Sequence, residues 1–143
     1  MTIRQLSIFI ENRTGKMLEA LETLAGANID LRALSLADTS DFGILRIIVD
    51  DSDYALETLR TAGFLVKSND VLAVVVGDKP GGLASVVRIL ADFGIGIEYS
   101  YAFIGHARDR AYVILRVDKN EGAISALEAN DVTLLSANDV RSM

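Results

Sequence analysis

The stretch Asn12–Met17, which reads Asn-Arg-Thr-Gly-Lys-Met, returns in similar form at Asp78–Leu83, which reads Asp-Lys-Pro-Gly-Gly-Leu. The two copies lie 66 residues apart, from 12 to 78 and from 17 to 83. Each follows an apolar run and precedes apolar residues at helical spacing, which predicts a strand, a glycine turn and a helix. The first amides of a helix lack intrahelical partners and carry partial positive charge. The sequence therefore predicts two sites suited to a carboxylate or phosphate.

The residues around the first copy predict a βαββαβ unit. Its strands and helices are expected, in order, at Ile3–Ile10, Met17–Ala25, Ile29–Ala37, Phe42–Val49, Tyr54–Ala62 and Phe64–Lys67. Polar turns are expected at Asp38–Asp41 and Ser68–Asp70. Asp50–Asp53 supplies acidic N-cap candidates for the second helix, and Gly26 with Asn28 supplies the stop signal of the first.

The same order is expected again in the second half, after a polar turn at Gly105–Arg110 that is two residues longer than its counterpart. The elements are expected at Val71–Gly77, Leu83–Phe93, Ile95–Phe103, Ala111–Val117, a helix capped by Asp118–Asn120 that carries Ile124 and Leu127, and Val132–Leu135. The predicted fold class is α+β: two tandem ferredoxin-like βαββαβ units with antiparallel sheets and helices on one face.

The predicted domains are residues 1–69 and 70–143. One unit of this size is only marginally stable alone, because it buries a small share of its surface, and the short connection argues for a fixed interface between the halves. Exchange of a strand between the halves is left open.

Composition excludes several classes of protein. Half of the 143 residues are hydrophobic and the net charge is −6, which is typical of a globular chain and unfavourable for binding a nucleic-acid backbone. The chain has no Cys, which excludes disulfides and thiolate sites and fits a cytoplasmic location. No signal segment opens the sequence and no apolar run is long enough to cross a membrane.

The residues of common catalytic sites are missing. His106 is the only histidine, and its polar surroundings predict a solvated loop residue. Without Cys or a second His, neither a metal site nor a nucleophile–base pair is expected, and no cofactor motif occurs. The third strands lack the aromatic and basic pattern of RNA-binding ferredoxin-like domains, and they lack the Asn of acylphosphatases. We therefore do not expect an enzyme.

The motifs resemble those of ACT domains, which are regulatory modules that bind small ligands, most often amino acids, between paired domains. The first copy carries the resemblance in Ile10–Met17, Gly26–Ile29 and Phe42–Ile47, and the second in Gly77–Leu83 and Phe93–Ile97. The first copy is most similar to the serine-sensing domain of phosphoglycerate dehydrogenase. The second copy departs from that pattern at Asp78 and Gly94, and Thr14 stands where the family usually has Pro.

The resemblance implies a site for an amino acid that uses residues of both copies. The ligand-binding candidates are Asn12, Arg13, Thr14, Gly15, Lys16, Met17, Asn28, Ile29, Asp78, Pro80, Gly81, Gly82, Leu83, Gly94 and Ile95. The turn amides would bind the ligand carboxylate, and Asn12 or Asp78 its ammonium. If the halves lie side by side, Asn12 would face Gly94 and Asp78 would face Asn28, which makes two unequal pockets. Ordinary turn and helix-end preferences also explain these residues.

The sequence thus predicts a non-catalytic regulator that binds a free amino acid and signals to a protein partner or through a homodimer. The alternative is a regulatory or scaffold subunit of an enzyme of amino-acid metabolism, with vestigial pockets and sheet edges that pair with the enzyme. Neither reading requires a metal, a nucleic acid or a membrane.

Overall fold

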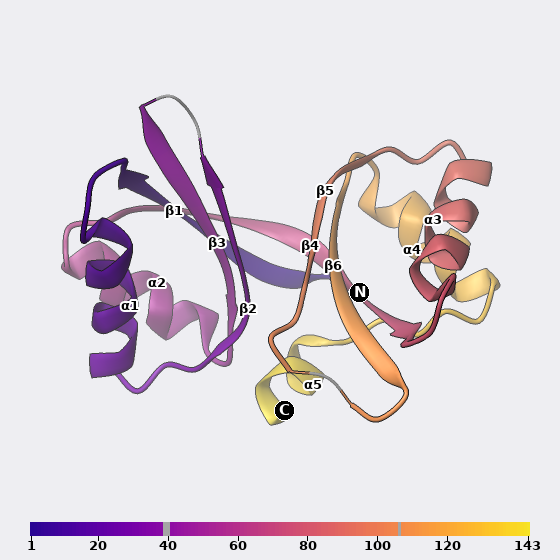
Figure 1. Ribbon diagram of the computed structural model, residues 1–143. Coiled ribbons are helices and arrows are strands. Elements are labelled where there is room, and N and C mark those ends of the chain that lie inside the picture. The colour runs from indigo at the N-terminus through magenta and orange to yellow at the C-terminus, as the bar shows by residue number, and fades with distance from the viewer. Residues whose placement is uncertain (39–40, 106) are drawn as a thin grey trace. The chain divides into compact units, whose positions relative to one another are not determined.

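The computed structural model describes residues 1–38, 41–105 and 107–143. The chain divides into two compact units (Figure 1). The N-terminal unit comprises residues 4–69 and 140–143, and the C-terminal unit comprises residues 70–139 and 1–3. Part of the predicted turn Asp38–Asp41, and the predicted solvated loop residue His106, lie outside the described residues.

The N-terminal unit has the predicted βαββαβ order. Its elements are β1 (Ile3–Glu11), α1 (Lys16–Gly26), β2 (Leu31–Asp38), β3 (Phe42–Val49), α2 (Ser52–Thr61) and the first part of β4 (Leu65–Gly77). The strand order is β2-β3-β1-β4. The register of the antiparallel pairs places Leu45 of β3 opposite Ile8 of β1 and opposite Leu36 of β2.

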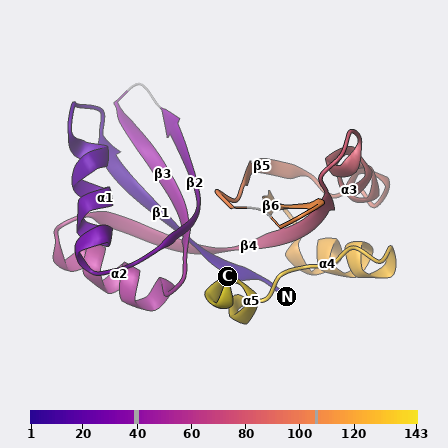
Figure 2. The ribbon, with the colours of Figure 1, turned by 60° about the horizontal axis from the view of Figure 1, so that its bottom comes forward.

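Both helices of the N-terminal unit cover the same face of its sheet, as predicted (Figures 1 and 2). The alternate residues of each strand and one stripe of each helix form a single buried cluster. Its most buried members are Leu6, Ile8, Ala20, Leu24, Leu45, Ile47, Ala55 and Leu59. The apolar residues that recur at helical and at strand spacing in the sequence thus pack together in one layer. Burial of this layer is the main source of stability for such a unit.

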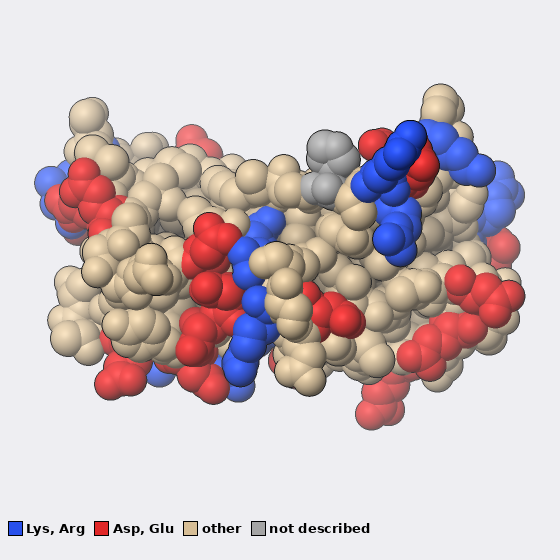
Figure 3. All heavy atoms as spheres, turned by 90° about the horizontal axis from the view of Figure 1, so that it is seen from below, with Lys and Arg blue, Asp and Glu red and all other residues tan. Residues whose placement is uncertain are grey.

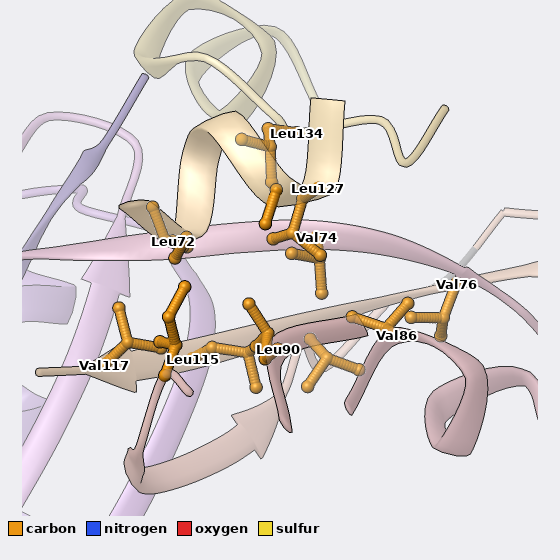
Figure 4. Close-up of a cluster of buried hydrophobic side chains, with 13 residues drawn as sticks. Leu72, Val74, Val76, Val86, Leu90, Leu115, Val117, Leu127 and Leu134 are labelled. Carbon is orange, nitrogen blue, oxygen red and sulfur yellow. The ribbon is translucent and has the colours of Figure 1, made fainter. Parts of the chain in front are cut away.

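The C-terminal unit repeats this architecture. It contains the second part of β4, followed by α3 (Gly82–Asp92), β5 (Ile97–Ala102), β6 (Arg110–Val117) and α4 (Asn120–Ala129). The strand order is β4-β6-β5, and Val113 of β6 lies opposite Val74 of β4 and Ala102 of β5. The core lies between these strands and helices α3 and α4, where side chains of both layers point toward one another (Figure 4). Leu72, Leu90, Leu115 and Leu127 are completely buried there.

The predicted turn at Ser68–Asp70 is wrong, because β4 runs without a break from Leu65 to Gly77. Ser68 and Asp70 are exposed on the strand, where polar side chains are acceptable. Asn69 accepts a hydrogen bond of 3.1 Å from the side-chain amide of Gln5 in β1, and Gln5 is fully buried. A buried amide needs such a partner, so the side chain of Asn69 supports the pairing of β4 with β1.

Two other differences concern the ends of elements. The predicted last strand Val132–Leu135 is reduced to one bridge between Leu134 and Val74, flanked by backbone bonds from Val75 to Thr133 and from Leu135 to Ala73. A short helix that was not predicted, α5 (Ala137–Ser142), follows it.

The acidic cap predicted for α2 is confirmed, since Asp51 accepts a bond of 3.1 Å from the amide of Tyr54. The start of α4 lies within the predicted range Asp118–Asn120, but Lys119 holds the N-cap position and makes no side-chain bond there. Asp118 accepts instead from the amide of Gly96 at 3.0 Å.

Candidate ligand-binding site

The two glycine turns predicted from the sequence join β1 to α1 and β4 to α3. Gly15 and Gly81 hold the N-cap positions with φ values of 90° and 84°, a left-handed conformation that glycine adopts at little cost. Neither helix has a side-chain cap. The next amides that could take a cap belong to Met17 and Leu18 in α1, and among the described residues these amides have no acceptor. Each unit therefore presents a helix start with free amides.

The first turn is held by its own backbone and by local ion pairs. The amide of Arg13 donates to the carbonyl of Glu11 at 2.8 Å, and the amide of Lys16 donates to the carbonyl of Arg13 at 3.3 Å. The Arg13 side chain pairs with Glu11 at 2.8 Å, and Lys16 pairs with Glu19 at 3.0 Å. Asn12, Thr14 and Gly15 are exposed. This compact turn leaves the amide side chain of Asn12 available to a ligand.

A cavity of about 260 Å³ lies beside the first turn. Three of the predicted site residues line it: Asn12, Arg13 and Met17. The rest of its lining comes from β1 and from the β2–β3 hairpin, with Ile10, Glu11, Leu36, Ala37, Asp38 and Gly43. Apolar walls with a few polar groups and adjacent free amides are the usual make-up of a small-molecule site.

The contribution of the hairpin was not predicted. Strand pairing places Gly43 opposite both Ile10 and Asp38, so the end of β2 and the turn after β1 line the same cavity. A Cβ at Gly43 would stand 3.4 Å from Leu36 and 3.5 Å from Ile10. The available signal in the sequence was the glycine itself, because a glycine inside a strand often marks a place of close approach.

Lys16 lies away from this cavity. It lines a second hollow of about 440 Å³ between α1 and the end of α2, with Glu19, Glu22, Thr23, Ala62, Gly63 and Phe64. The structure therefore separates Lys16 from Asn12, Arg13 and Met17, although all four were predicted to serve one site.

The second turn is tighter than the first. A Cβ at Gly82 would lie 2.0 Å from the carbonyl oxygen of Gly77, so only glycine fits there. Lys16 holds the matching position of the first turn. Asp78 and Pro80 are exposed, and the amide of Asp78 donates to the carbonyl of Asp109 at 3.0 Å. Leu83 is also exposed, at 41%.

The predicted site residues after the first helix of each unit have a clear structural role. Asn28 and Gly94 adopt left-handed conformations with φ of 58° and 69°. Their amides donate to Ala25 and Ala91, each at 3.0 Å, and so close the helix ends. Ile29 and Ile95 are buried in the cores of their own units. That these four residues also take part in ligand binding stays a prediction.

Other kinds of site find little support in the described part of the chain. Residues 1–38, 41–105 and 107–143 contain no group of three or more His, Asp or Glu placed to hold a metal ion. No helix in these ranges has the length and apolar character that crossing a membrane requires. On the face shown in Figure 3, Lys and Arg side chains stand beside Asp and Glu, and the described residues form no broad basic surface there.

The comparison with family models matches the whole chain, residues 1–143, to the ACT domain pair. The chain belongs to the ACT domain family. This ACT domain pair has 40% sequence identity to a protein of Bacteroides thetaiotaomicron of known structure, with a TM-score of 0.93 over 100% of this chain and 98% of that one.

Regulatory subunits of aspartate kinase share the fold of this ACT domain pair. The subunit from Thermus thermophilus has 21% identity and a TM-score of 0.61, over 88% of this chain and 90% of that one. The subunit from Thermus flavus has 20% identity and a TM-score of 0.60 over the same shares. No curated protein sequence matches the chain.

Proposed function

We propose that this ACT domain pair is a non-catalytic regulatory protein that binds a free amino acid at its strand-to-helix turns. The observation that carries the proposal is the cavity beside the first turn, which unites Asn12, Arg13 and Met17 with the uncapped start of α1. The family and the fold shared with regulatory subunits of aspartate kinase support a regulatory role.

The chemistry of the turn suits a zwitterion. The free amides of Met17 and Leu18 and the partial positive charge of the helix start favour the ligand carboxylate. The left-handed Gly15 has no Cβ, so the ligand can approach the backbone closely. Asn12 offers a side-chain oxygen to the ammonium group. At about 260 Å³ the cavity suits a small ligand rather than one of drug size.

Regulation would follow because a ligand that binds one state of a protein better than another shifts the population toward that state. The signal would pass to a partner protein or to a second copy of the chain.

The test is the thermal unfolding of the protein with each standard L-amino acid in turn. A ligand that binds the folded state stabilises it by about 2.7 kcal/mol at a concentration 100 times Kd. One or a few amino acids should raise Tm, and Asn12→Ala should reduce that rise. The exposed Asn138→Ala on α5, far from the cavity in sequence and absent from its lining, is the matched control.

If no amino acid raises Tm, amino-acid binding is refuted. The alternative would then take its place: a regulatory or scaffold subunit with vestigial pockets, which acts by pairing its sheet edges with an enzyme of amino-acid metabolism.

A further inference from the structure

The two units differ in the placement of carboxylates near their turns, at two matching positions whose carboxylates make no ion pair with the described residues. In the C-terminal unit the carboxylate is that of Asp78, on the turn itself, where the N-terminal unit has Asn12. In the N-terminal unit it is Asp38, at the end of β2. The matching residue of the C-terminal unit is Ile104.

Strand register supports the match between Asp38 and Ile104. Leu36 pairs with Leu45 in the N-terminal unit, and Ala102 pairs with Val113 at the same place in the C-terminal unit. Asp38 and Ile104 each follow two residues later. The N-terminal unit thus has a carboxylate at the end of its second strand, where the C-terminal unit has Ile104, and the C-terminal unit has one on the turn, where the N-terminal unit has Asn12.

Asp38 lies in the wall of the cavity beside the first turn, together with Met17 at the start of α1. The other carboxylate of that wall, Glu11, already accepts a bond of 2.8 Å from Arg13. The remaining walls include the apolar side chains of Ile10 and Leu36. A cation in this cavity would therefore find in Asp38 a carboxylate that has no ion-pair partner in the part of the chain that the structure describes.

We propose that Asp38 is the specificity-determining residue of the first turn and accepts the ammonium group of the bound amino acid, the role expected of Asp78 in the second turn. This inference rests on the proposed function. It assigns the ligand class of the first cavity as α-amino acids with a free ammonium group, and excludes their deaminated carboxylic acids. The ligand carboxylate would lie at the start of α1. The two charged ends of the ligand would therefore be bound by two different elements, the ammonium group by β2 and the carboxylate by α1.

The physical reason is charge. A hydrogen bond between an ammonium and a carboxylate is about twice as strong as one between neutral groups. A deaminated acid would instead place its own negative charge in a cavity with Asp38 and Glu11 in the wall. The amide of Asn12 can assist the ammonium, but it carries no charge to oppose the deaminated acid.

The experiment is a ligand titration monitored by the backbone amide NMR signals. These signals report binding at each of the two turns separately in one molecule. Gly15 and Gly43 report the first turn, and Gly81 and Gly82 report the second. The probes are each standard L-amino acid and, for those that bind, the deaminated acid of the same side chain. Asp38→Asn should weaken binding at Gly15 and Gly43 at least about tenfold, and binding at Gly81 and Gly82 should be unchanged.

Three further variants sharpen this test. Asp41→Asn removes a carboxylate from the same hairpin outside the cavity and should change affinity less than about twofold. Glu11→Gln should have a smaller effect than Asp38→Asn. The double variant Asn12→Asp with Asp38→Asn moves the carboxylate to the place it has in the C-terminal unit, and should restore most of the lost affinity.

The outcomes are distinct. If no amino acid binds at either turn, the proposed function falls and this inference falls with it. If an amino acid binds at the first turn and Asp38→Asn leaves its affinity unchanged, only the role of Asp38 is refuted. Equal binding of the deaminated acid at the first turn, or no rescue by Asn12→Asp, also refutes that role.

Discussion

Gly82 stands against the carbonyl of Gly77, so closely that a Cβ at residue 82 would lie 2.0 Å from that oxygen. The start of α3 is thereby pressed onto the end of β4. At the matching position of the first turn Lys16 carries a full side chain, so the two turns of the protein differ in tightness although their sequences are similar.

The first prediction follows from that contact. Gly82→Ala should lower the free energy of unfolding by at least about 2 kcal/mol, because the added carbon meets backbone that cannot move aside without shifting β4. Urea unfolding measures the effect. Gly26→Ala is the control, since nothing lies within 4 Å of a Cβ there and the residue is helical. It should stabilise slightly, and equal effects of the two substitutions would contradict the prediction.

Asn28 allows a structural role to be separated from a ligand-binding role. Its φ of 58° is costly for most residues but not for glycine. Asn28→Ala should therefore destabilise the protein by about 1 kcal/mol, while Asn28→Gly should leave its stability nearly unchanged. If Asn28→Gly also leaves amino-acid affinity unchanged, the side chain of Asn28 has no part in binding. Chemical unfolding and calorimetric titration of the same two variants give both answers.

Gly43 should control access to the cavity beside the first turn. Gly43→Val adds methyl groups where a Cβ already contacts Ile10 and Leu36, so it should lower the free energy of unfolding by about 1–3 kcal/mol, and amino-acid binding at this turn should be lost. Gly43→Ala, which copies Ala111 of the C-terminal unit, should have an intermediate effect. Full binding by Gly43→Val would show that the ligand does not use this cavity. The amide NMR signal of Gly15 measures amino-acid binding by these variants.

The hydrogen bonds between Asp139 and Ser136 at the start of α5 should break at low pH. Asp139 accepts bonds from the backbone amide of Ser136 at 2.7 Å and from its hydroxyl at 2.8 Å, and these bonds hold the pKa of Asp139 below its usual value. A carboxylate with a lowered pKa in the folded state contributes stability above its unfolded pKa of about 3.9, and loses it as pH falls through the lower folded value. The cap should thus persist at pH 5 and be lost only as pH falls through the folded pKa of Asp139, which lies below the unfolded value.

Carboxyl NMR of Asp139 measures this pKa directly. Ser136→Ala removes the hydroxyl bond but keeps the backbone bond, so it should raise the pKa of Asp139 part of the way to its usual value. A pKa at or above that value in the unmodified protein would contradict the cap.

Sequence reasoning succeeded where the information is local. The period of apolar residues identified four helices and most strands, and the repeated glycine turn identified the two helix starts. It failed at Ser68–Asp70, because a run of three polar residues is typical of a turn. What makes that segment a strand is pairing with β1, including the bond between Gln5 and Asn69, and those residues are far apart in sequence.

The sequence by itself determined the order of helices and strands in the two units, the glycine turns that open α1 and α3, and Asn12, Arg13 and Met17 as candidates for one site. Only the tertiary structure decided that Leu36, Asp38 and Gly43 complete a cavity there and that Lys16 does not belong to it. The reason is that a turn or a helix end depends on a few adjacent residues. The walls of a cavity depend instead on the register between strands, which places Gly43 opposite Ile10 across 33 positions of the chain.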